Sequence, residues 1–273
     1  MTRRRSICHF SVLLISFVLV SCSDQMVESV VITGSTTVAP VVADAAKRFE
    51  ENNPGIRIDV QTGGSSRGIS DAKSGLADLG MVSRHLNTGE EDLSATCIAI
   101  DGVGLIVHRQ NELKGLTREQ VIQLYKKEIT NWSGVGGTTG PVTVTNKADG
   151  RGTLEVFLAY TGLDSADIKA DVIVGGNQQA IKTVAGNPGA IGYVSIGAAL
   201  SEIENGTPIR LLESDGIPAV PAMVAQGKFP ITRPLLLVSG GQNSPLVAEF
   251  LSYLQSEETR DIIESHLYVP VAK

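Results

Sequence analysis

NKADGRGTLEVF, residues 146–157, is a polar, glycine-containing loop that runs directly into an apolar-periodic segment. Two glycines flank Arg151, Lys147 lies upstream, and Thr153 opens the apolar run. The pattern predicts a loop followed by a helix N-terminus, where the first backbone N–H groups have no partner within the helix. Those N–H groups, a hydroxyl and two cations in so few residues indicate a site for an anion.

Two earlier loops repeat this design. TGSTTVAP (33–40) and TGGSSRGI (62–69) each place hydroxyl side chains after an expected strand and before an expected helix. The hydroxyl residues singled out in them are Ser35, Thr36, Thr37 and Ser65. One such loop is weak evidence, because Ser and Thr before a helix are usually only N-caps. Three of them in one chain favour a shared anion site.

Segments of helical and of strand periodicity alternate along the chain. Residues 56–62, IRIDVQT, alternate apolar and polar side chains and predict a strand, whereas 39–52 carries one apolar face and predicts a helix. A further helix is expected over 117–132, where Thr117 and Gln120 form a capping box. This alternation predicts an α/β fold with parallel sheets covered on both faces. No flexible linker marks a domain boundary, so two domains would join through strand crossovers.

Catalytic patterns are scarce. Beyond the N-terminal segment the histidines are His85, His108 and His266, and they show no metal-ligand spacing with one another or with a cysteine. The chain has no G-x-S-x-G elbow and no Walker motif. We therefore expect no enzymatic activity, no metal and no cofactor. A hydrolase of phosphate esters stays as an alternative that lacks a visible nucleophile–base pair.

The N-terminus resembles an export signal. Residues 3–5 are arginines, and the apolar run over 10–20 is too short to span a bilayer as a helix. LVSC, residues 19–22, resembles a bacterial lipobox, in which the cysteine becomes the lipidated first residue of the mature protein. We expect residues 1–21 to be a lipoprotein signal peptide, Cys22 to carry the lipid, and the protein to lie outside the cytoplasm on a membrane.

Charge and cysteine content exclude several classes of partner. Without residues 1–21 the chain has 20 basic and 29 acidic residues, a net charge of −9, and no long basic run. Nucleic acid is therefore not expected as a partner. Cys97 is the only cysteine besides Cys22 in the mature chain, so no intramolecular disulfide framework is expected, and its apolar neighbours predict a core position.

Seven stretches occur in the order found in the phosphate-binding proteins of bacterial phosphate ABC importers, which the chain resembles from about Val30 to Val269. They are VITGSTTVAP, GGSSRGI, DLGMVSR, AIDGVGLIV, EITNWSGVGG, GRGTLEVF and GNPGAIGYVS. The resemblance implies a two-lobed, periplasmic binding protein-like fold of type II with the ligand in the cleft between the lobes. It implies a discontinuous lobe 1, residues 27–108 and 234–273, and a lobe 2 of residues 109–233.

Matched motif by motif, the resemblance also implies ligand contacts. These come from Ser35, Thr36, Thr37, Ser65, Ser83, Arg84, Gly152 and Thr153. The chain departs from the family motif R-x-x-G-S-G-T, because Lys147 replaces its arginine and Arg151 replaces its serine. Only arginine offers a planar, two-pronged donor to an oxyanion. Arg151 either takes over the role of the missing guanidinium or points to solvent, and Lys147 is expected to contact the ligand.

Selectivity requires a further group. At neutral pH phosphate carries a proton that sulfate lacks, and a buried carboxylate could accept a hydrogen bond from that proton. Asp101, in AIDGVG, is the candidate, and the alternative is a turn aspartate before a glycine. On this hypothesis Asp101→Asn loses discrimination between phosphate and sulfate.

The sequence is interpreted as an extracytoplasmic lipoprotein that binds inorganic phosphate and delivers it to an ABC permease. Two alternatives remain open. One is a binding protein for another oxyanion, such as sulfate, arsenate or molybdate. The other is a phosphate sensor or adhesion protein without a permease.

Overall fold

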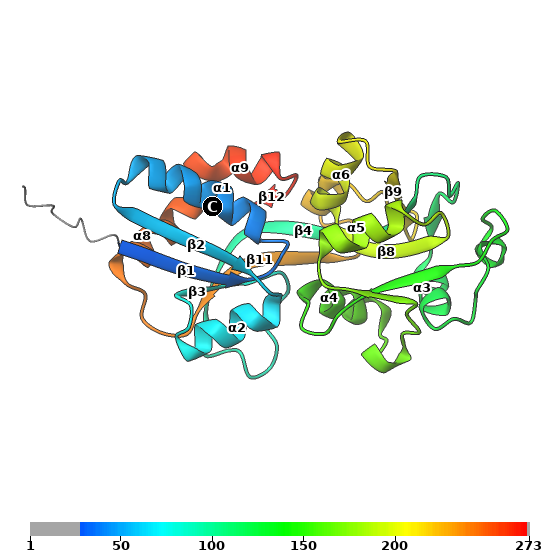
Figure 1. The fold of residues 1–273 in the computed structure, drawn as a ribbon, viewed down its shortest axis with the longest axis horizontal. Coiled ribbons are helices and arrows are strands. Elements are labelled where there is room, and N and C mark those ends of the chain that lie inside the picture. Colours follow the sequence, from blue (N-terminus) through cyan, green and yellow to red (C-terminus); the bar gives the residue numbers. More distant parts are fainter. Residues whose placement is uncertain (1–27, 272–273) are drawn as a thin grey trace, which may run out of the picture.

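The computed structural model describes residues 28–271. The expected signal segment, residues 1–21, and the expected lipidation site, Cys22, lie outside the described residues. The described chain forms two lobes along the long axis of the molecule, joined by two long strands (Figure 1). Within this part of the chain, no helix has the length and apolar character needed to cross a membrane.

Lobe 1 begins with a parallel sheet in which β1 lies between β2 and β3. Its elements are β1 (Glu28–Gly34), α1 (Ala39–Asn52), β2 (Ile56–Thr62), α2 (Ser65–Ser74) and β3 (Leu79–Val82). The apolar face of α1 is buried, including Val42, Ala45 and Phe49, as its spacing predicts. The helix stops before Pro54-Gly55, because a proline cannot continue the backbone hydrogen bonds.

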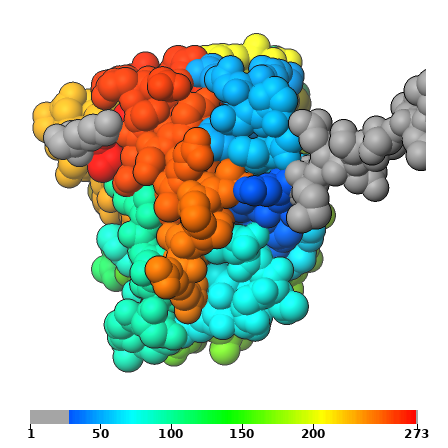
Figure 2. Space-filling view, turned by 90° about the vertical axis from the view of Figure 1, so that its left-hand side faces the viewer, coloured from blue at the N-terminus to red at the C-terminus, as the bar shows by residue number. Residues whose placement is uncertain are grey.

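The C-terminal segment completes lobe 1. It contains α8 (Pro245–Leu254), η3 (Glu257–Thr259), α9 (Arg260–Ser265) and β12 (Val269–Pro270). Both α8 and α9 contact α1, and the ring centroids of Phe250 and Phe49 are 5.3 Å apart in an edge-on pair. Figure 2 looks onto this end of the molecule and shows the C-terminal helices (orange to red) beside the N-terminal elements (blue). Lobe 1 is thus built from both ends of the described chain.

Lobe 2 is formed by the middle of the chain, with β6 between β7 and β8 in a second parallel arrangement. Its elements are β5 (Gly115–Leu116), α3 (Arg118–Tyr125), η1 (Trp132–Val135), β6 (Thr143–Lys147), α4 (Gly152–Thr161), η2 (Ser165–Asp167), β7 (Val172–Val174), α5 (Asn177–Ala185), β8 (Ala190–Ser195), α6 (Ile196–Glu204), β9 (Ile209–Leu211), β10 (Glu213–Ser214) and α7 (Pro221–Ala225). The capping box of Thr117 and Gln120 is confirmed. The helix that it caps, α3, ends at Tyr125 and not at residue 132 as expected, because Lys127 has a left-handed φ of 60°.

Two strands, β4 (Ser94–His108) and β11 (Thr232–Ser239), connect the lobes. From Ser94 to Gly102, β4 pairs antiparallel with β11, and from Val103 onward it pairs antiparallel with β8 of lobe 2. The chain therefore leaves lobe 1 inside β4, earlier than the expected boundary at residue 108. The expected parallel sheets are present in both lobes, but β4 and β11 run antiparallel to their neighbours.

Each lobe has its own apolar core. One cluster joins α1, α8 and α9 to β1 and β3, and a second joins α3 and α4 to β6 and β8. Cys97, expected in a core, is only partly buried and packs against a small cluster that includes Ile69 and Val82. Two separate cores allow each lobe to move largely as a rigid body, with the connecting strands as the hinge.

Candidate anion-binding site

Five helices begin at the boundary between the lobes. α1 and α2 follow β1 and β2 in lobe 1, and α4, α5 and α6 follow β6, β7 and β8 in lobe 2. The backbone N–H of Ser66 donates to the carbonyl of Gly150 at 3.2 Å, and Nδ2 of Asn177 donates to Oγ1 of Thr37 at 3.1 Å. These contacts join the loops of one lobe to those of the other. The positive ends of helix dipoles from both lobes thus meet in one region, which favours an anion there.

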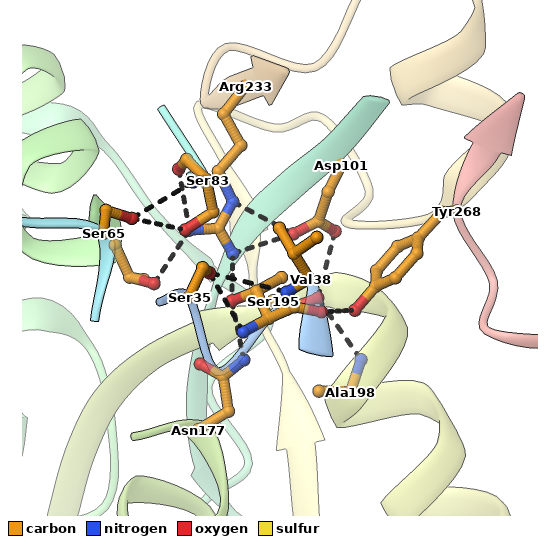
Figure 3. Close-up of polar contacts among 12 residues, drawn as sticks. Ser35, Val38, Ser65, Ser83, Asp101, Asn177, Ser195, Ala198, Arg233 and Tyr268 are labelled. Atoms are coloured by element: carbon orange, nitrogen blue, oxygen red, sulfur yellow. Dashed lines mark hydrogen bonds and ion pairs between the residues drawn. The ribbon is translucent and has the colours of Figure 1, made fainter. Parts of the chain in front are cut away.

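Arg233 lies at the centre of this region (Figure 3). It belongs to β11, and its side chain is completely buried. Nε and Nη2 donate to Oδ2 of Asp101 at 3.1 and 2.8 Å, and Nη1 donates to Oγ1 of Thr153 at 2.8 Å. Nη2 also reaches Oγ1 of Thr37 at 3.2 Å. One guanidinium therefore contacts β4, the loop before α1, and the first turn of α4.

Asp101 is held by protein donors on both oxygens. Oδ2 accepts from Arg233, and Oδ1 accepts from the hydroxyl of Ser195 at 3.1 Å. Burial raises the pKa of Asp101 above its usual value, and the Arg233 guanidinium opposes that rise. These contacts make Asp101 the counter-ion that orients Arg233, which differs from the expected acceptor of a ligand proton. Its effect on selectivity stays a prediction.

Ser65 and Ser83 lie against the start of α4. Their hydroxyls are 3.4 Å apart, and the backbone N–H of Ser83 donates to Oγ of Ser65 at 3.1 Å. Figure 3 shows both serines on the side of Arg233 away from Asp101. A methyl group at Gly152 would overlap the Ser65 hydroxyl, so only glycine lets the α4 backbone come this close to lobe 1. The structure thus brings together the loop at 62–69, Ser83 after β3 and the loop that leads into α4.

The hydroxyl side chains of the loop at 33–40 have different roles. Oγ of Ser35 accepts the backbone N–H groups of Thr37 at 3.1 Å and Val38 at 3.4 Å, so it stabilises the start of α1. Thr37 is buried and points its own hydroxyl at Arg233 and Asn177. Thr36 instead lines a cleft between the lobes. Of the three, Thr37 is the side chain that joins the central cluster.

Lys147 ends β6 with a buried ammonium group that forms no ion pair within residues 28–271. Its Nζ atom is 3.3 Å from Oδ1 of Asn177. Burial, and to a smaller extent the nearby charges of Arg233 and Arg151, together lower the pKa of Lys147 to about 7. A buried ammonium without a carboxylate partner is costly, and an anion beside it would relieve that cost.

Arg151 lies at the entrance to the site. It lines an interlobe cleft of about 480 Å³ together with Thr36, Gly63, Gly176 and Gln179. A methyl group at Gly175 would lie 3.3 Å from its Nη2 atom, so its guanidinium reaches the loop before α5. Arg151 therefore neither joins the central cluster nor points away from the cleft.

Arg84 follows Ser83 but turns away from the cluster. Its Nη1 atom is 2.7 Å from Oε2 of Glu90, and its Nε atom is 2.7 Å from Oε2 of Glu155. With two carboxylates beside it, this guanidinium has no unpaired charge to offer an anion. The implied ligand contact of Arg84 is not supported by its position.

Sequence analysis missed Arg233, Asn177 and Ser195. The available signal was a single arginine at the start of an apolar strand, ITRPLLLVS, because a charge in a buried strand requires a partner. That partner, Asp101, is 132 positions away in the chain. Nothing local in the sequence connects the two residues.

The cluster is suited to binding and not to covalent chemistry. It consists of hydroxyls, an amide, two cations and helix N-termini, with one carboxylate that is already paired. Within residues 28–271 no three His, Cys, Asp or Glu side chains are grouped so that they could hold a metal ion. The arrangement offers hydrogen-bond donors from two lobes to an oxyanion enclosed between them.

We expect Arg233→Met to lower the free energy of unfolding by about 3–5 kcal/mol, because it leaves Asp101 buried without its cation. Asp101→Asn added to it should recover part of that loss, since the double variant no longer buries an unpaired charge. Urea unfolding of the single and double variants measures both effects. If the two losses simply add, the residues do not act as a pair.

Comparisons with known proteins agree with this architecture. A family model described as a PBP superfamily domain matches residues 20–258. A crystal structure from Clostridium perfringens, described as a phosphate ABC transporter substrate-binding protein with bound phosphate, is 32% identical with a TM-score of 0.84, over 90% of this chain and 100% of that chain. The ABC-type phosphate transport receptor from Vibrio cholerae is 29% identical with a TM-score of 0.74, over 89% of this chain and 100% of that chain.

A curated relative points the same way. The phosphate-binding protein PstS of Bacillus subtilis (strain 168) is 29% identical over 249 residues, which is 89% of this chain and 81% of that protein. None of these three relatives is named as an enzyme. The predicted resemblance and the two-lobed α/β fold are confirmed, and the chain belongs to the PBP superfamily and, within it, to the family of phosphate ABC transporter substrate-binding proteins.

Proposed function

We propose that the protein binds inorganic phosphate between its lobes outside the cytoplasm and delivers it to an ABC permease. The observation that carries this proposal is the buried, unpaired ammonium of Lys147 beside hydroxyls and helix N-termini from both lobes. Such a region holds an anion by hydrogen bonds and charge alone. The relatives described as phosphate-binding and phosphate-transport proteins support phosphate as the anion.

The proposed contacts follow from the positions of the predicted residues. We assign direct donors to Thr37, Ser65, Ser83, Lys147, Gly152 and Thr153, with Arg233 at their centre. Arg151 and Thr36 line the interlobe cleft and would act on the approaching anion, while Ser35 and Asp101 organise the surrounding structure. The net charge of −9 without residues 1–21 does not oppose binding, because screening weakens distant charges far more than those in the cleft.

Membrane attachment is the second part of the proposal. The lipobox-like LVSC at residues 19–22 supports a lipid on Cys22, which would keep the protein near its permease. We expect Cys22→Ser to move the protein from the membrane fraction to the soluble fraction, because a lipid chain supplies the apolar surface that holds it there. Fractionation of cells that express each form measures this. Membrane retention of the variant would point to another anchor.

Calorimetric titration of the mature protein, after unfolding and refolding to remove carried-over ligand, tests the ligand. We expect one-to-one binding of phosphate and, on the hypothesis that the Asp101 carboxylate accepts the phosphate proton, a much weaker response to sulfate. Arsenate and molybdate serve as further oxyanions in the same series. Binding of another oxyanion without binding of phosphate would mean that Lys147 and Arg151 have changed the anion that the site selects.

Binding of phosphate is expected to take up a proton at Lys147. Its pKa of about 7 in the folded protein means that most of the amine is neutral at pH 8, and an anion beside it favours the ammonium form. We expect uptake of up to about one proton at pH 8 and much less at pH 6, where the amine is already charged. Titrations in buffers of different ionisation enthalpy measure the uptake. Lys147→Met keeps any proton exchange of phosphate itself, so its difference from the wild type gives the share of Lys147. Equal uptake in the two proteins would exclude Lys147 as the titrating group.

A further inference from the structure

An ion pair connects the lobes outside the central cluster. Nε of Arg84 in lobe 1 is 2.7 Å from Oε2 of Glu155 in lobe 2. Arg84 follows β3, and Glu155 lies in the first turn of α4. Apart from the Asp101–Arg233 pair within the connecting strands, this is the only ion pair within residues 28–271 that joins the two lobes.

Lobe 1 holds Arg84 in position for this contact. Nη1 and Nη2 donate to the two carboxylate oxygens of Glu90 at 2.7 and 3.0 Å, and Nη1 also donates to the carbonyl of His85 at 2.8 Å. The Arg84 side chain is 4% exposed. Because Glu90 and His85 belong to lobe 1, these bonds do not depend on where lobe 2 lies. The Nε edge of the guanidinium is thereby fixed toward lobe 2, where its contact with Glu155 is one of charge, because Nε forms no hydrogen bond among the described residues.

Only one carboxylate oxygen of Glu155 has partners across the interface between the lobes. Its Oε2 atom contacts Arg84 and accepts Nδ2 of Asn87 at 2.9 Å, whereas Oε1 is buried and has no hydrogen-bond partner among the described residues. A surface groove of about 300 Å³ runs beside these three residues. Separation of the lobes would let water from the groove reach Oε1. The pair therefore favours the closed arrangement without locking it.

Closure of the site and formation of this pair are mechanically linked. Glu155 lies two positions after Thr153 on the same helix, and that helix begins at Gly152, which packs against Ser65. A movement that brings the first turn of α4 against lobe 1 therefore also brings Glu155 to Arg84. A lobe separation that opens the anion site must break the ion pair.

We propose that Arg84 and Glu155 set the affinity for the anion by stabilising the closed arrangement, although neither side chain contacts the ligand. The inference rests on the proposed function, because it concerns the same cleft. A ligand held by both lobes binds only the closed state, so its apparent dissociation constant rises as the closed fraction falls. The pair acts on that fraction and leaves the ligand contacts unchanged.

Glu155→Gln tests the proposal, because it keeps the size of the side chain and removes its charge. We expect the dissociation constant for phosphate to rise about three- to tenfold, mainly through faster dissociation. Glu128→Gln is the matched control. It removes a carboxylate that pairs with Lys126 at 2.8 Å within lobe 2, and should leave the affinity within about twofold.

Small-angle X-ray scattering of the mature protein separates closure from direct contact. We expect Glu155→Gln without ligand to show a larger radius of gyration than the wild type, and saturating phosphate to return both to the same closed value. Asn87→Ala, which removes the other donor to the same oxygen, should shift both measurements in the same direction by less. Unchanged affinity in Glu155→Gln, or weaker binding with unchanged scattering, would overturn the proposal.

Failure of the proposed function gives a different result. If the wild type does not bind phosphate in calorimetry, the phosphate assignment is wrong. The comparison of ligand-free scattering between the wild type and Glu155→Gln then still decides whether the ion pair holds the lobes together.

Discussion

The buried ion pair between Arg233 and Asp101 is the interaction on which the placement of the two lobes depends. The two residues lie opposite each other on β11 and β4, the strands that carry the chain between the lobes. Each charge offsets the cost of burying the other. Hydroxyls of Thr37 and Thr153 then attach the starts of α1 and α4 to the same guanidinium. The anion-binding loops are thereby positioned relative to the hinge before any ligand arrives.

The two buried cations of the central cluster, Arg233 and Lys147, have different roles because, among the described residues, only Arg233 has a counter-ion. Arg233 is matched by Asp101, so its net contribution to binding an anion is mainly the geometry of its donors. Lys147 has only an amide oxygen at 3.3 Å, and its lowered pKa records the cost of its burial. Under the proposed function, the negative charge of a ligand would therefore be balanced chiefly by Lys147 and by the helix N-termini.

In the two proposals, one set of side chains contacts the ligand and another stabilises the closed cleft. Ser83 and Thr153 face the central cluster, whereas their near neighbours Arg84 and Glu155 face each other on its flank. On α4, residues two positions apart point in different directions, so one turn of helix supplies both a donor and a charge for closure. A substitution at Arg84 or Glu155 can then alter the affinity for the ligand without altering the ligand contacts.

Local patterns in the sequence determined the α/β class, the helix-starting loops at 33–40, 62–69 and 148–157, and the capping box of Thr117. These features depend on side-chain period and on hydrogen bonds within one turn, which neighbouring residues decide. Tertiary structure alone decided that Arg233 pairs with Asp101, that Arg84 pairs with Glu155 instead of a ligand, and that β4 changes lobe midway. Each of these depends on which strands and helices meet. That choice is made by the packing of two cores over long chain separations, and no local spacing encodes which buried charge will face which.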